Sequence, residues 1–310
     1  GTGSFGNAFV NYSIKNNLFK KIIIFSRDEM KQWFMKSKYQ KHLTKLRFFI
    51  GDVRDYRRLE KALIDVDMVI HAAATKIVST AEYDPFECVK TNVVGAMNVI
   101  DACINRNIPR VLALSTDKAC NPINLYGSTK LASDKLFIAS NHYASKSSTK
   151  FSIMRYGNVI SSRGSVIPFF LEMKNLNKSL PVTDKNMTRF FISLNDAVIS
   201  CLDAFSNMVG GEIFVKKCKS LKILDLAKAV SKNIKIIGIR PGEKIHEIMI
   251  DKNETNNTYE FKDHFRIVPR IFSEKIVNQI SKKGKLVQKS FEYASNVNNY
   301  WISKKEIDNI

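Results

Sequence analysis

Apolar runs and amphipathic stretches alternate regularly through the first half of the chain. Short runs rich in Ile, Val, Leu and Phe predict buried strands at residues 21–26, 46–52, 68–74, 110–116 and 151–159. Between them, apolar residues recur at helical spacing and predict helices at 5–16, 28–38, 57–66, 86–107 and 125–142. This alternation is typical of parallel β-α units. We therefore expect an α/β fold with a doubly wound parallel Rossmann sheet, whose ligands bind at the carboxyl ends of the strands.

Beyond residue 160 the alternation gives way to shorter segments, with a turn at "RPGEK" (240–244) and a stretch rich in Lys and Asn towards the end. We expect the sheet domain to occupy residues 1–160. Residues 161–310 are then mainly a smaller ligand-binding lobe laid over the strand ends, with room for strands that return to the sheet.

The net charge of +20 raises the question of nucleic-acid binding. The lysines, however, are spread along the whole chain, and no recognition motif or cluster of basic and aromatic residues accompanies them. We expect a basic, solvated surface that attracts a small anionic ligand, and no nucleic-acid partner.

The five cysteines are odd in number, widely spaced and free of C-x-x-C pairs. Neither a disulfide framework nor a metal site is therefore predicted, and reduced thiols favour a cytoplasmic protein. Apolar runs also stay well short of the roughly 20 residues of a membrane helix, so no membrane partner is expected.

The chain opens with "GTGSFG", which reads as G-x-G-x-x-G from Gly1 to Gly6. Such a turn lays a dinucleotide pyrophosphate on a helix N-terminus, and it normally follows a β-strand. Nothing precedes Gly1 here. We expect the missing strand upstream of residue 1, central in the sheet. The chain is then a fragment whose folding and cofactor binding suffer from the loss of that strand.

The strand after the glycine turn indicates which dinucleotide binds. An NAD site usually carries a carboxylate at the end of this strand, whereas Ser26 and Arg27 stand there in this chain. A guanidinium suits a 2′-phosphate by charge and geometry, and Asp28 comes late for a ribose contact. We therefore predict NADP, with Asp52 and Val53 near the adenine. Ala72 and its neighbours are small enough to let the backbone approach the cofactor.

Tyr126 and Lys130 are four residues apart on a predicted helix, so their side chains share one face. A lysine ammonium beside a phenol lowers the pKa of the phenol, which makes Tyr126 a usable base near neutral pH. The pair follows a strand that ends in Ser115 and Thr116. In this setting Y-x-x-x-K resembles the short-chain dehydrogenase/reductase superfamily, whose tyrosine removes a hydroxyl proton while hydride passes to nicotinamide.

Asp117 and Lys118 come directly after the same strand, at the ligand edge of the sheet. A plain reductase needs only the Ser/Thr, Tyr and Lys. The added carboxyl and amine supply an acid and a base for a second reaction on the same substrate, such as the elimination of water.

Taken together, the motifs resemble the soluble, inverting UDP-N-acetylglucosamine 4,6-dehydratases over essentially the whole chain. They are "GTGSFG", "FSRDE", "RFFIGDVRD", "HAAATK", "STDKACNPINLYGSTK", "RYGNV", "SRGSVIPFF", "MTRFFI", "GGEIFV" and "IIGIRPGEKIHEIMI". The resemblance implies an extended short-chain dehydrogenase fold, tightly bound NADP, UDP-GlcNAc as substrate and a homo-oligomer. It also implies a 4-keto-6-deoxy product with inverted C5, the first intermediate of pseudaminic acid biosynthesis in flagellin glycosylation.

The resemblance assigns a role to each catalytic residue. Tyr126, assisted by Lys130 and Thr116, takes the C4 hydroxyl proton; Lys118 removes the C5 proton; Asp117 protonates the departing C6 hydroxyl. A proton then returns to C5 from the opposite face, and the sequence leaves its donor unnamed.

The remaining site residues are assigned by motif position. The residues assigned to the cofactor are Thr2, Gly3, Ser4, Phe5, Gly6, Ser26, Arg27, Asp28, Asp52, Val53, Ala72, Lys76, Leu114, Ser115, Tyr126 and Lys130. Those assigned to the nucleotide sugar are Lys76, Asn158, Val159, Arg163, Val166 and Thr183, with Arg240 and Glu243 at the uridine diphosphate.

Three other functions compete with this prediction. The retaining 4,6-dehydratases share most motifs but tend to replace the tyrosine by methionine, and they are usually membrane-tethered. The sugar-nucleotide 4-epimerases keep the tyrosine and lysine but lack the Asp-Lys pair. A cofactor-binding scaffold without turnover is the non-enzymatic alternative.

Overall fold

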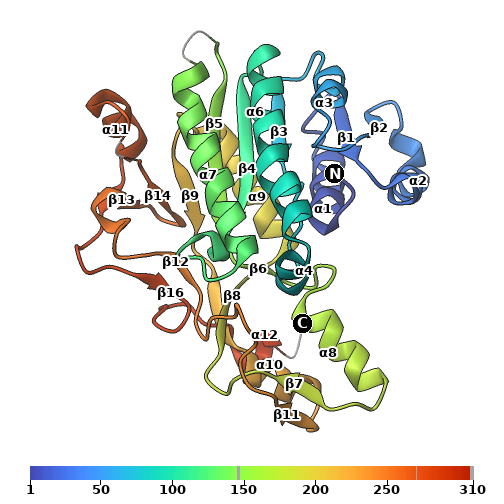
Figure 1. The fold of residues 1–310 in the computed structure, drawn as a ribbon, viewed down its shortest axis with the longest axis vertical. Helices are drawn as coiled ribbons and strands as arrows, with labels where there is room; N and C mark the ends of the chain where they lie inside the picture. The colour runs from blue at the N-terminus through green and yellow to red at the C-terminus, as the bar shows by residue number, and fades with distance from the viewer. Residues whose placement is uncertain (145–146, 270, 308–310) are drawn as a thin grey trace.

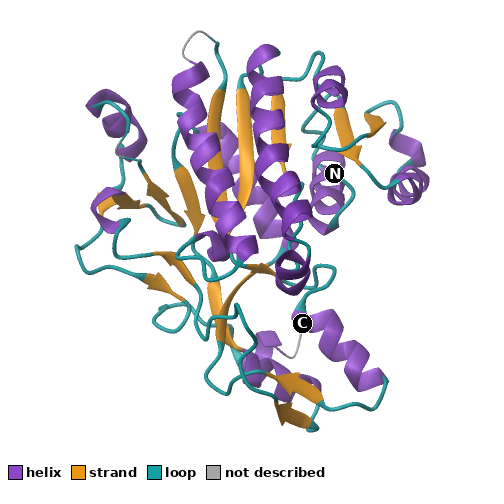
Figure 2. Ribbon diagram, in the orientation of Figure 1, coloured by secondary structure: helices purple, strands orange, loops and turns teal. Residues whose placement is uncertain are grey.

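The strands predicted between residues 68 and 159 are three neighbouring strands at one end of a seven-stranded sheet (Figures 1 and 2). The structure, a computed structural model, describes residues 1–144, 147–269 and 271–307. Four strands run parallel in the order β3 (Met68–His71), β4 (Arg110–Thr116), β5 (Lys150–Tyr156) and β9 (Ile213–Lys216). Three antiparallel strands extend the sheet beyond β9: β14 (His264–Ile267), β13 (Thr258–Glu260) and β15 (Lys285–Leu286). The chain therefore has the predicted α/β fold with a Rossmann-like sheet.

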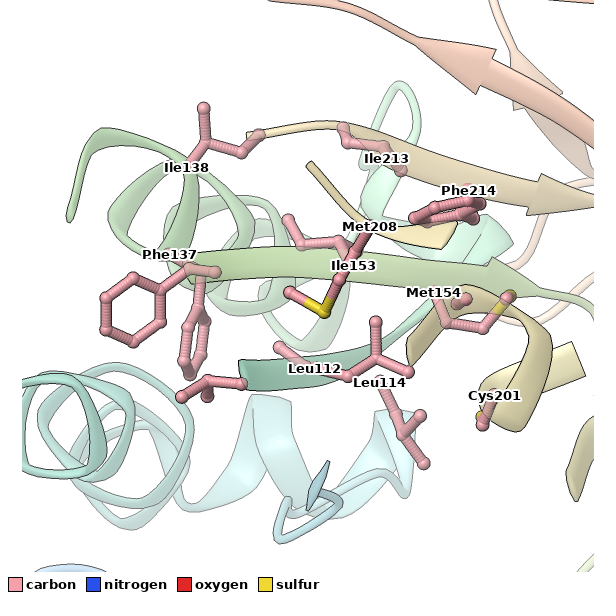
Figure 3. Close-up of a cluster of buried hydrophobic side chains, with 14 of the residues drawn as sticks. Leu112, Leu114, Phe137, Ile138, Ile153, Met154, Cys201, Met208, Ile213 and Phe214 are labelled. Atoms are coloured by element: carbon pink, nitrogen blue, oxygen red, sulfur yellow. The ribbon is translucent and has the colours of Figure 1, made fainter. Parts of the chain in front are cut away.

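Helices cover both faces of this sheet, which explains why β4 is buried at every position except its two end residues. In Figure 1, α6 (Gly95–Asn105) and α7 (Leu125–Tyr143) lie in front of the strands and α9 (Leu194–Asn207) lies behind them. Figure 3 shows part of the resulting core, where Leu112 and Ile153 of neighbouring strands meet Phe137 of α7. The parallel strands are thus fixed from both sides, and their carboxyl ends point to one edge.

The first two strands pair with each other and with no other strand in the part of the chain that the structure describes. β1 (Ile22–Ser26) and β2 (Leu46–Ile50) run parallel, and Ile24 and Leu46 pack with Val10 in a small core of their own. The helices of this region and its continuation are α1 (Ser4–Lys15), α2 (Glu29–Lys38), α3 (Tyr56–Ala62), α4 (Val78–Tyr83) and α5 (Pro85–Val89), with a 3₁₀ turn at Gln40–His42.

Two predicted elements are interrupted in the structure. The single helix predicted over 86–107 consists of α5, a π-helical turn at Lys90–Val94 and α6. The strand predicted over 151–159 ends at Tyr156, and β6 (Asn158–Val159) pairs instead with β8 (Thr188–Ile192). Gly157 permits this change of sheet, because a Cβ there would lie 2.4 Å from Phe190 Cβ. Such close backbone approach is reserved for glycine.

A second apolar cluster lies below the sheet in Figure 1 and contains Phe170, Leu180, Phe191 and Leu226. Its strands, with the remaining short ones, are β7 (Leu180–Val182), β8, β10 (Lys219–Lys222), β11 (Ile234–Ile236), β12 (Ile248–Ile250) and β16 (Tyr293–Ala294). The helices beyond residue 160, besides α9, are α8 (Val166–Asn175), α10 (Ile223–Val230), α11 (Glu274–Ser281) and α12 (Lys304–Ile307), with a 3₁₀ turn at Thr255–Asn257. Because β9, β13, β14 and β15 return from this half to the main sheet, the boundary at residue 160 stays a prediction.

Among the described residues, no helix combines the length and the apolar character needed to cross a membrane.

Candidate active site

The end of β4 leads directly into the residues for which the sequence predicts a catalytic role. A 3₁₀ turn at Asp117–Ala119 follows Thr116, and α7 begins six residues later with Asn124 as its N-cap, accepting a hydrogen bond from Gly127 N at 2.8 Å. A Cβ at Gly127 would lie 2.3 Å from the Lys118 carbonyl oxygen. Glycine at this position therefore lets the first turn of α7, which carries Tyr126, pack against the turn that carries Asp117 and Lys118.

Lys118 is held between two buried carboxyl groups. Its Nζ lies 3.1 Å from Asp117 Oδ1 and 3.2 Å from Glu247 Oε1, and it donates a 3.5 Å hydrogen bond to Asn158 Oδ1. The side chains of Asp117 and Glu247 are 0% and 3% exposed, whereas that of Lys118 is 22% exposed. The amine is thus the part of this cluster that solvent or a ligand can reach.

The two carboxyl groups of this cluster differ in protonation. Burial raises the pKa of Asp117, and the attraction of Lys118 offsets this only in part. Burial acts in the same direction on Glu247, but Lys118 and Arg189 outweigh it and lower its pKa. Asp117 is therefore biased towards the neutral acid and Glu247 towards the carboxylate.

Lys118 itself is biased towards the ammonium form. Burial alone would lower its pKa, but Asp117 and Glu247 outweigh burial and the pKa is raised. A base must be neutral to accept a proton, so the environment of Lys118 opposes the role of C5 base until the charge around it changes.

Tyr126 is buried on the first turn of α7. The sequence predicted that Lys130 lowers the pKa of its phenol, and this prediction is wrong in this structure. Lys130 Nζ donates to the Leu114 carbonyl oxygen at 2.7 Å, and burial raises the pKa of Tyr126 to about 12. The cation that opposes this rise is Lys118, assisted by a hydrogen bond with Thr116. Burial also lowers the pKa of Lys130. The four-residue spacing placed both side chains correctly on the helix, but it did not account for desolvation.

The glycine turn has the shape that an anionic ligand needs. Gly3 is the N-cap of α1 in an extended conformation, and a Cβ there would meet nothing within 4 Å. A Cβ at Gly6 would lie 1.8 Å from the Gly1 carbonyl oxygen, so that position requires glycine. The first turn of α1 carries no acidic residue. An open helix N-terminus of this kind suits the pyrophosphate of a dinucleotide.

At the end of β1, the side chains differ in what they can offer a cofactor. Ser26 Oγ accepts hydrogen bonds from Thr2 Oγ1 at 3.2 Å and from Gln32 Nε2 at 3.1 Å. The carboxylate of Asp28 accepts from Lys31 N and caps α2. Arg27 is 54% exposed, and its guanidinium lies 3.8 Å from Asp52 Oδ2. The cation is therefore available to a ligand, while the acid is already used by the helix.

The other predicted cofactor residues lie at or just beyond the carboxyl ends of β2, β3 and β4. Asp52 is bound by Arg54, which overcomes the effect of burial and lowers the pKa of Asp52. Val53 packs against Gly95 at the π-helical turn, and its carbonyl accepts from Asn98 Nδ2 at 3.0 Å. Ala72 is exposed beyond the end of β3, while Leu114 and Ser115 are buried in β4.

Three of the predicted ligand contacts meet in space although they are far apart in the sequence. Lys76 Nζ donates to the Arg163 carbonyl at 2.9 Å, and Arg163 N donates to Ser4 Oγ at 3.1 Å. Burial lowers the pKa of Lys76. The structure thus joins the glycine turn, the loop after β3 and the loop before α8 around one place, as a site shared by cofactor and sugar requires.

The other predicted sugar residues are more dispersed. Asn158 contacts Lys118 directly, Val159 pairs with Ile192 in β6, and Val166 is the first residue of α8. Thr183 is buried, and its hydroxyl donates to Met187 Sδ at 3.1 Å.

The "RPGEK" loop is attached to the catalytic turn. Gly242, at φ 77°, accepts a 2.8 Å hydrogen bond from Asn124 Nδ2 through its carbonyl, and Lys244 Nζ donates to Cys120 O at 2.8 Å. Arg240 is 55% exposed and lies 4.0 Å from Glu243 Oε1. The exposed guanidinium is free to turn towards a phosphate.

Sequence reasoning missed Glu247, Arg189 and Asn92. Glu247 and Arg189 stand inside the quoted motifs "IIGIRPGEKIHEIMI" and "MTRFFI", each directly before an apolar run, which was the available signal. Asn92 lies on the π-helical turn and bonds the backbone of Thr75 and the hydroxyl of Thr129, joining the loop after β3 to α7. Nothing in its sequence context marked it, although π-helical turns often occur at functional sites.

Comparisons with known proteins show the family of the chain. The model of a family described as polysaccharide biosynthesis protein matches residues 1–269. A Campylobacter jejuni protein named UDP-N-acetylglucosamine 4,6-dehydratase (inverting) is 52% identical and covers 99% of this chain and 94% of its own length. A Rickettsia conorii protein named UDP-glucose 4-epimerase is 45% identical over 86% of this chain and 80% of its own length.

Solved structures show the same fold. Pen from Bacillus thuringiensis superposes with a TM-score of 0.89 at 33% identity, covering 99% of this chain and 94% of its own. The dTDP-glucose 4,6-dehydratase DesIV from Streptomyces venezuelae, solved with NAD bound, has a TM-score of 0.70 at 19% identity, covering 79% of this chain and 84% of its own.

Proposed function

This chain belongs to the polysaccharide biosynthesis protein family, and we propose that it is an inverting UDP-N-acetylglucosamine 4,6-dehydratase that uses NADP. The observation that carries the proposal is the placement of Asp117 and Lys118 beside Tyr126 at the carboxyl end of β4. The 52% identity to a protein of that name supports it over nearly the whole chain.

The catalytic residues divide the proposed reaction into two parts. Bound NADP supplies the acceptor for the C4 hydride and its return to C6. Tyr126 accepts the C4 hydroxyl proton, assisted by Thr116, whose hydroxyl donates to Asp117 Oδ1 at 2.8 Å in this structure. Because a ketone at C4 acidifies the C5 proton, Lys118 can then remove that proton. Asp117, biased towards its neutral form, donates a proton to the departing C6 hydroxyl.

The preference for NADP over NAD rests on Arg27 and Asp28. The guanidinium of Arg27 is exposed, whereas the carboxylate of Asp28 caps α2. An Arg27→Ser variant should lose roughly tenfold in affinity for NADP, the equivalent of one exposed charge-assisted contact, and little for NAD. Titration of both dinucleotides with wild type and variant measures this, and equal losses for the two would refute the preference for NADP.

The nucleotide sugar is proposed to lie between the two halves of the chain. Lys76, Asn158, Val159, Arg163, Val166 and Thr183 would contact the sugar, and Arg240 and Glu243 the uridine diphosphate. The exposed Arg240 and the joined Lys76 and Arg163 support this placement. We extend the proposal to a cytoplasmic homo-oligomer that carries out the first step of pseudaminic acid biosynthesis for flagellin glycosylation. The five free cysteines are compatible with a reducing compartment.

A second function is supported by the 45% identity to a protein named UDP-glucose 4-epimerase. Epimerisation at C4 needs Tyr126 and Lys130, but it gives Asp117 and Lys118 no catalytic role. A retaining dehydratase would use the pair, but Tyr126 favours the inverting branch. A scaffold that binds NADP without turnover gives no catalytic role to Asp117, Lys118, Tyr126 or Lys130.

One experiment separates these possibilities. Purified protein is incubated with UDP-GlcNAc, and the product is identified by NMR. A 4-keto-6-deoxy sugar with inverted C5 supports the proposal. The same sugar with unchanged C5 indicates the retaining reaction, and UDP-GalNAc indicates an epimerase. An unchanged substrate with demonstrable NADP binding indicates the scaffold.

A further inference from the structure

Glu247 is the one residue that brings a negative charge from the C-terminal half of the chain to the catalytic lysine, within the described residues. It lies just before β12, and its Oε1 is 3.2 Å from Lys118 Nζ. The side chain is 3% exposed, so this ion pair is shielded from water and from salt. Nothing in the reaction as proposed above uses this carboxylate.

The structure holds Glu247 in place from its backbone and its side chain. Its N–H donates to Ser295 Oγ at 2.9 Å, and Ser295 Oγ bonds the hydroxyl of Thr188 at 2.6 Å. Arg189 Nε lies 3.6 Å from Glu247 Oε1 on the side away from solvent. A buried carboxylate fixed in this way is a built counter-ion with little freedom to move away.

We propose that Glu247 is a positioning residue for the C5 reaction: its carboxylate fixes the Lys118 amine beside Asp117 and Asn158 and sets the protonation of both Asp117 and Lys118. This inference rests on the proposed dehydratase function and deepens it. It explains why the pKa values of Asp117 and Lys118, which are neighbours in the sequence, are both raised in this buried site.

The charges around the two groups determine the sign of the effect. Lys118 faces Asp117, Glu247, Arg189 and Tyr126. Glu247 faces Lys118, Arg189 and Lys244. The negative charge of Glu247 raises the pKa of both Lys118 and Asp117. Removing this charge should therefore lower both pKa values, so that a lysine base and an aspartic acid both titrate at lower pH.

The test measures C5 proton exchange separately from hydride transfer. The holoenzyme is incubated in D₂O with the 4-keto-6-deoxy sugar of unchanged C5 configuration, whose C5 proton lies on the face that Lys118 serves. Deuterium at C5 is followed by NMR across the pH range, after subtraction of the uncatalysed rate. The variants are Glu247→Gln, which keeps the shape and a hydrogen-bond acceptor, and Glu247→Asp, which keeps the charge.

The control is Glu212→Gln. Glu212 is also a buried carboxyl group, but it accepts from Val209 N and Gly210 N and has no contact with Lys118. Thermal melts of all variants report whether they fold, and only folded variants enter the comparison.

We expect the pH profile of C5 exchange, which follows the Lys118 base, to move to lower pH by about one pH unit or more in Glu247→Gln. Glu247→Asp should restore the wild-type position of the profile at reduced height, and Glu212→Gln should leave the position unchanged. A profile that only loses height in Glu247→Gln, or that shifts equally in Glu212→Gln, overturns the inference. If the wild type forms no 4-keto-6-deoxy sugar from UDP-GlcNAc, the proposed function fails instead, and the two failures are thereby distinguished.

Discussion

Lys118 lies in the turn after β4 and Lys130 lies in α7, and the fold gives their amines opposite environments. Lys118 lies between the carboxyl groups of Asp117 and Glu247, which raise its pKa. Lys130 donates to the Leu114 carbonyl oxygen, and burial lowers its pKa. The comparison shows that two identical side chains can be prepared for different tasks. One is held as an ammonium beside an acid, and the other is biased towards a neutral hydrogen-bond donor.

The largest effect is expected at Lys118. Lys118→Met should lower dehydration by about 10³- to 10⁴-fold, because general base catalysis is lost. It should leave NADP bound, because the amine contacts no residue assigned to the cofactor. Product formation by NMR and cofactor content after purification measure the two effects. A variant that retains full dehydration would remove the distinction between the two lysines.

Arg155 is a second buried cation between carboxyl groups, and we expect it to stabilise the fold. It is 1% exposed, lies 3.1 Å from Glu254 Oε2 and 3.9 Å from Asp134 Oδ2, and cannot lose its charge. Arg155→Met should lower the free energy of unfolding by about 3–5 kcal/mol, since it leaves two carboxyl groups without their cation. Urea denaturation of folded protein measures this. A loss below about 1 kcal/mol would show that the Arg155 cluster has no structural role.

Tyr126 separates the hydride step from the C5 step. Tyr126→Phe should slow the first hydride transfer by about 10²- to 10³-fold, because the base for the C4 hydroxyl is lost. It should leave C5 exchange of the preformed 4-keto product largely intact. Single-turnover absorbance of the reduced nicotinamide and deuterium incorporation at C5 report the two steps. Equal loss of both would contradict the separation of the site into two parts.

The smallest effect is on the pH dependence of stability, and it distinguishes the two lysines directly. The lowered pKa of Lys130 means that the folded state binds fewer protons than the unfolded state as the pH approaches the ordinary value of 10.5. Lys130 therefore makes stability rise with pH there, by at most about 1.4 kcal/mol per pH unit. The raised pKa of Lys118 takes effect only above that value, where stability falls as pH rises.

Denaturation of wild type, Lys130→Met and Lys118→Met between pH 8 and 10 checks this expectation. Lys130→Met should flatten the rise in stability, whereas Lys118→Met should keep its slope. If Lys118→Met flattens the rise and Lys130→Met keeps it, the lowered pKa belongs to Lys118 and not to Lys130.

The sequence was sufficient for the main elements because they depend on local pattern. Apolar runs predicted β3, β4 and β5, and helical periodicity predicted α1, α2 and α7, with errors mostly at the ends. The π-helical turn and the break at Gly157 were missed, because both depend on contacts with distant residues, Phe190 in the case of Gly157. Strand pairing across the two halves of the chain is likewise a tertiary property.

The site was predictable where chemistry lies on neighbouring residues and not where it depends on long-range contacts. Asp117, Lys118, Tyr126 and Lys130 were all found from spacing along one strand and one helix. Glu247 was missed, because it comes from a segment more than 100 residues away, and so was the raised pKa of Tyr126, which depends on burial.

The most direct test of the account is the reaction of the wild-type holoenzyme with UDP-GlcNAc in D₂O, with the product analysed by NMR. We predict one deuterium at an inverted C5, from which Lys118 has removed the original proton, and a C6 methyl group that contains only protium. Its third hydrogen comes from C4 of the same sugar and not from solvent. Protium retained at C5, deuterium in the methyl group or an intact C6 hydroxyl would contradict the account.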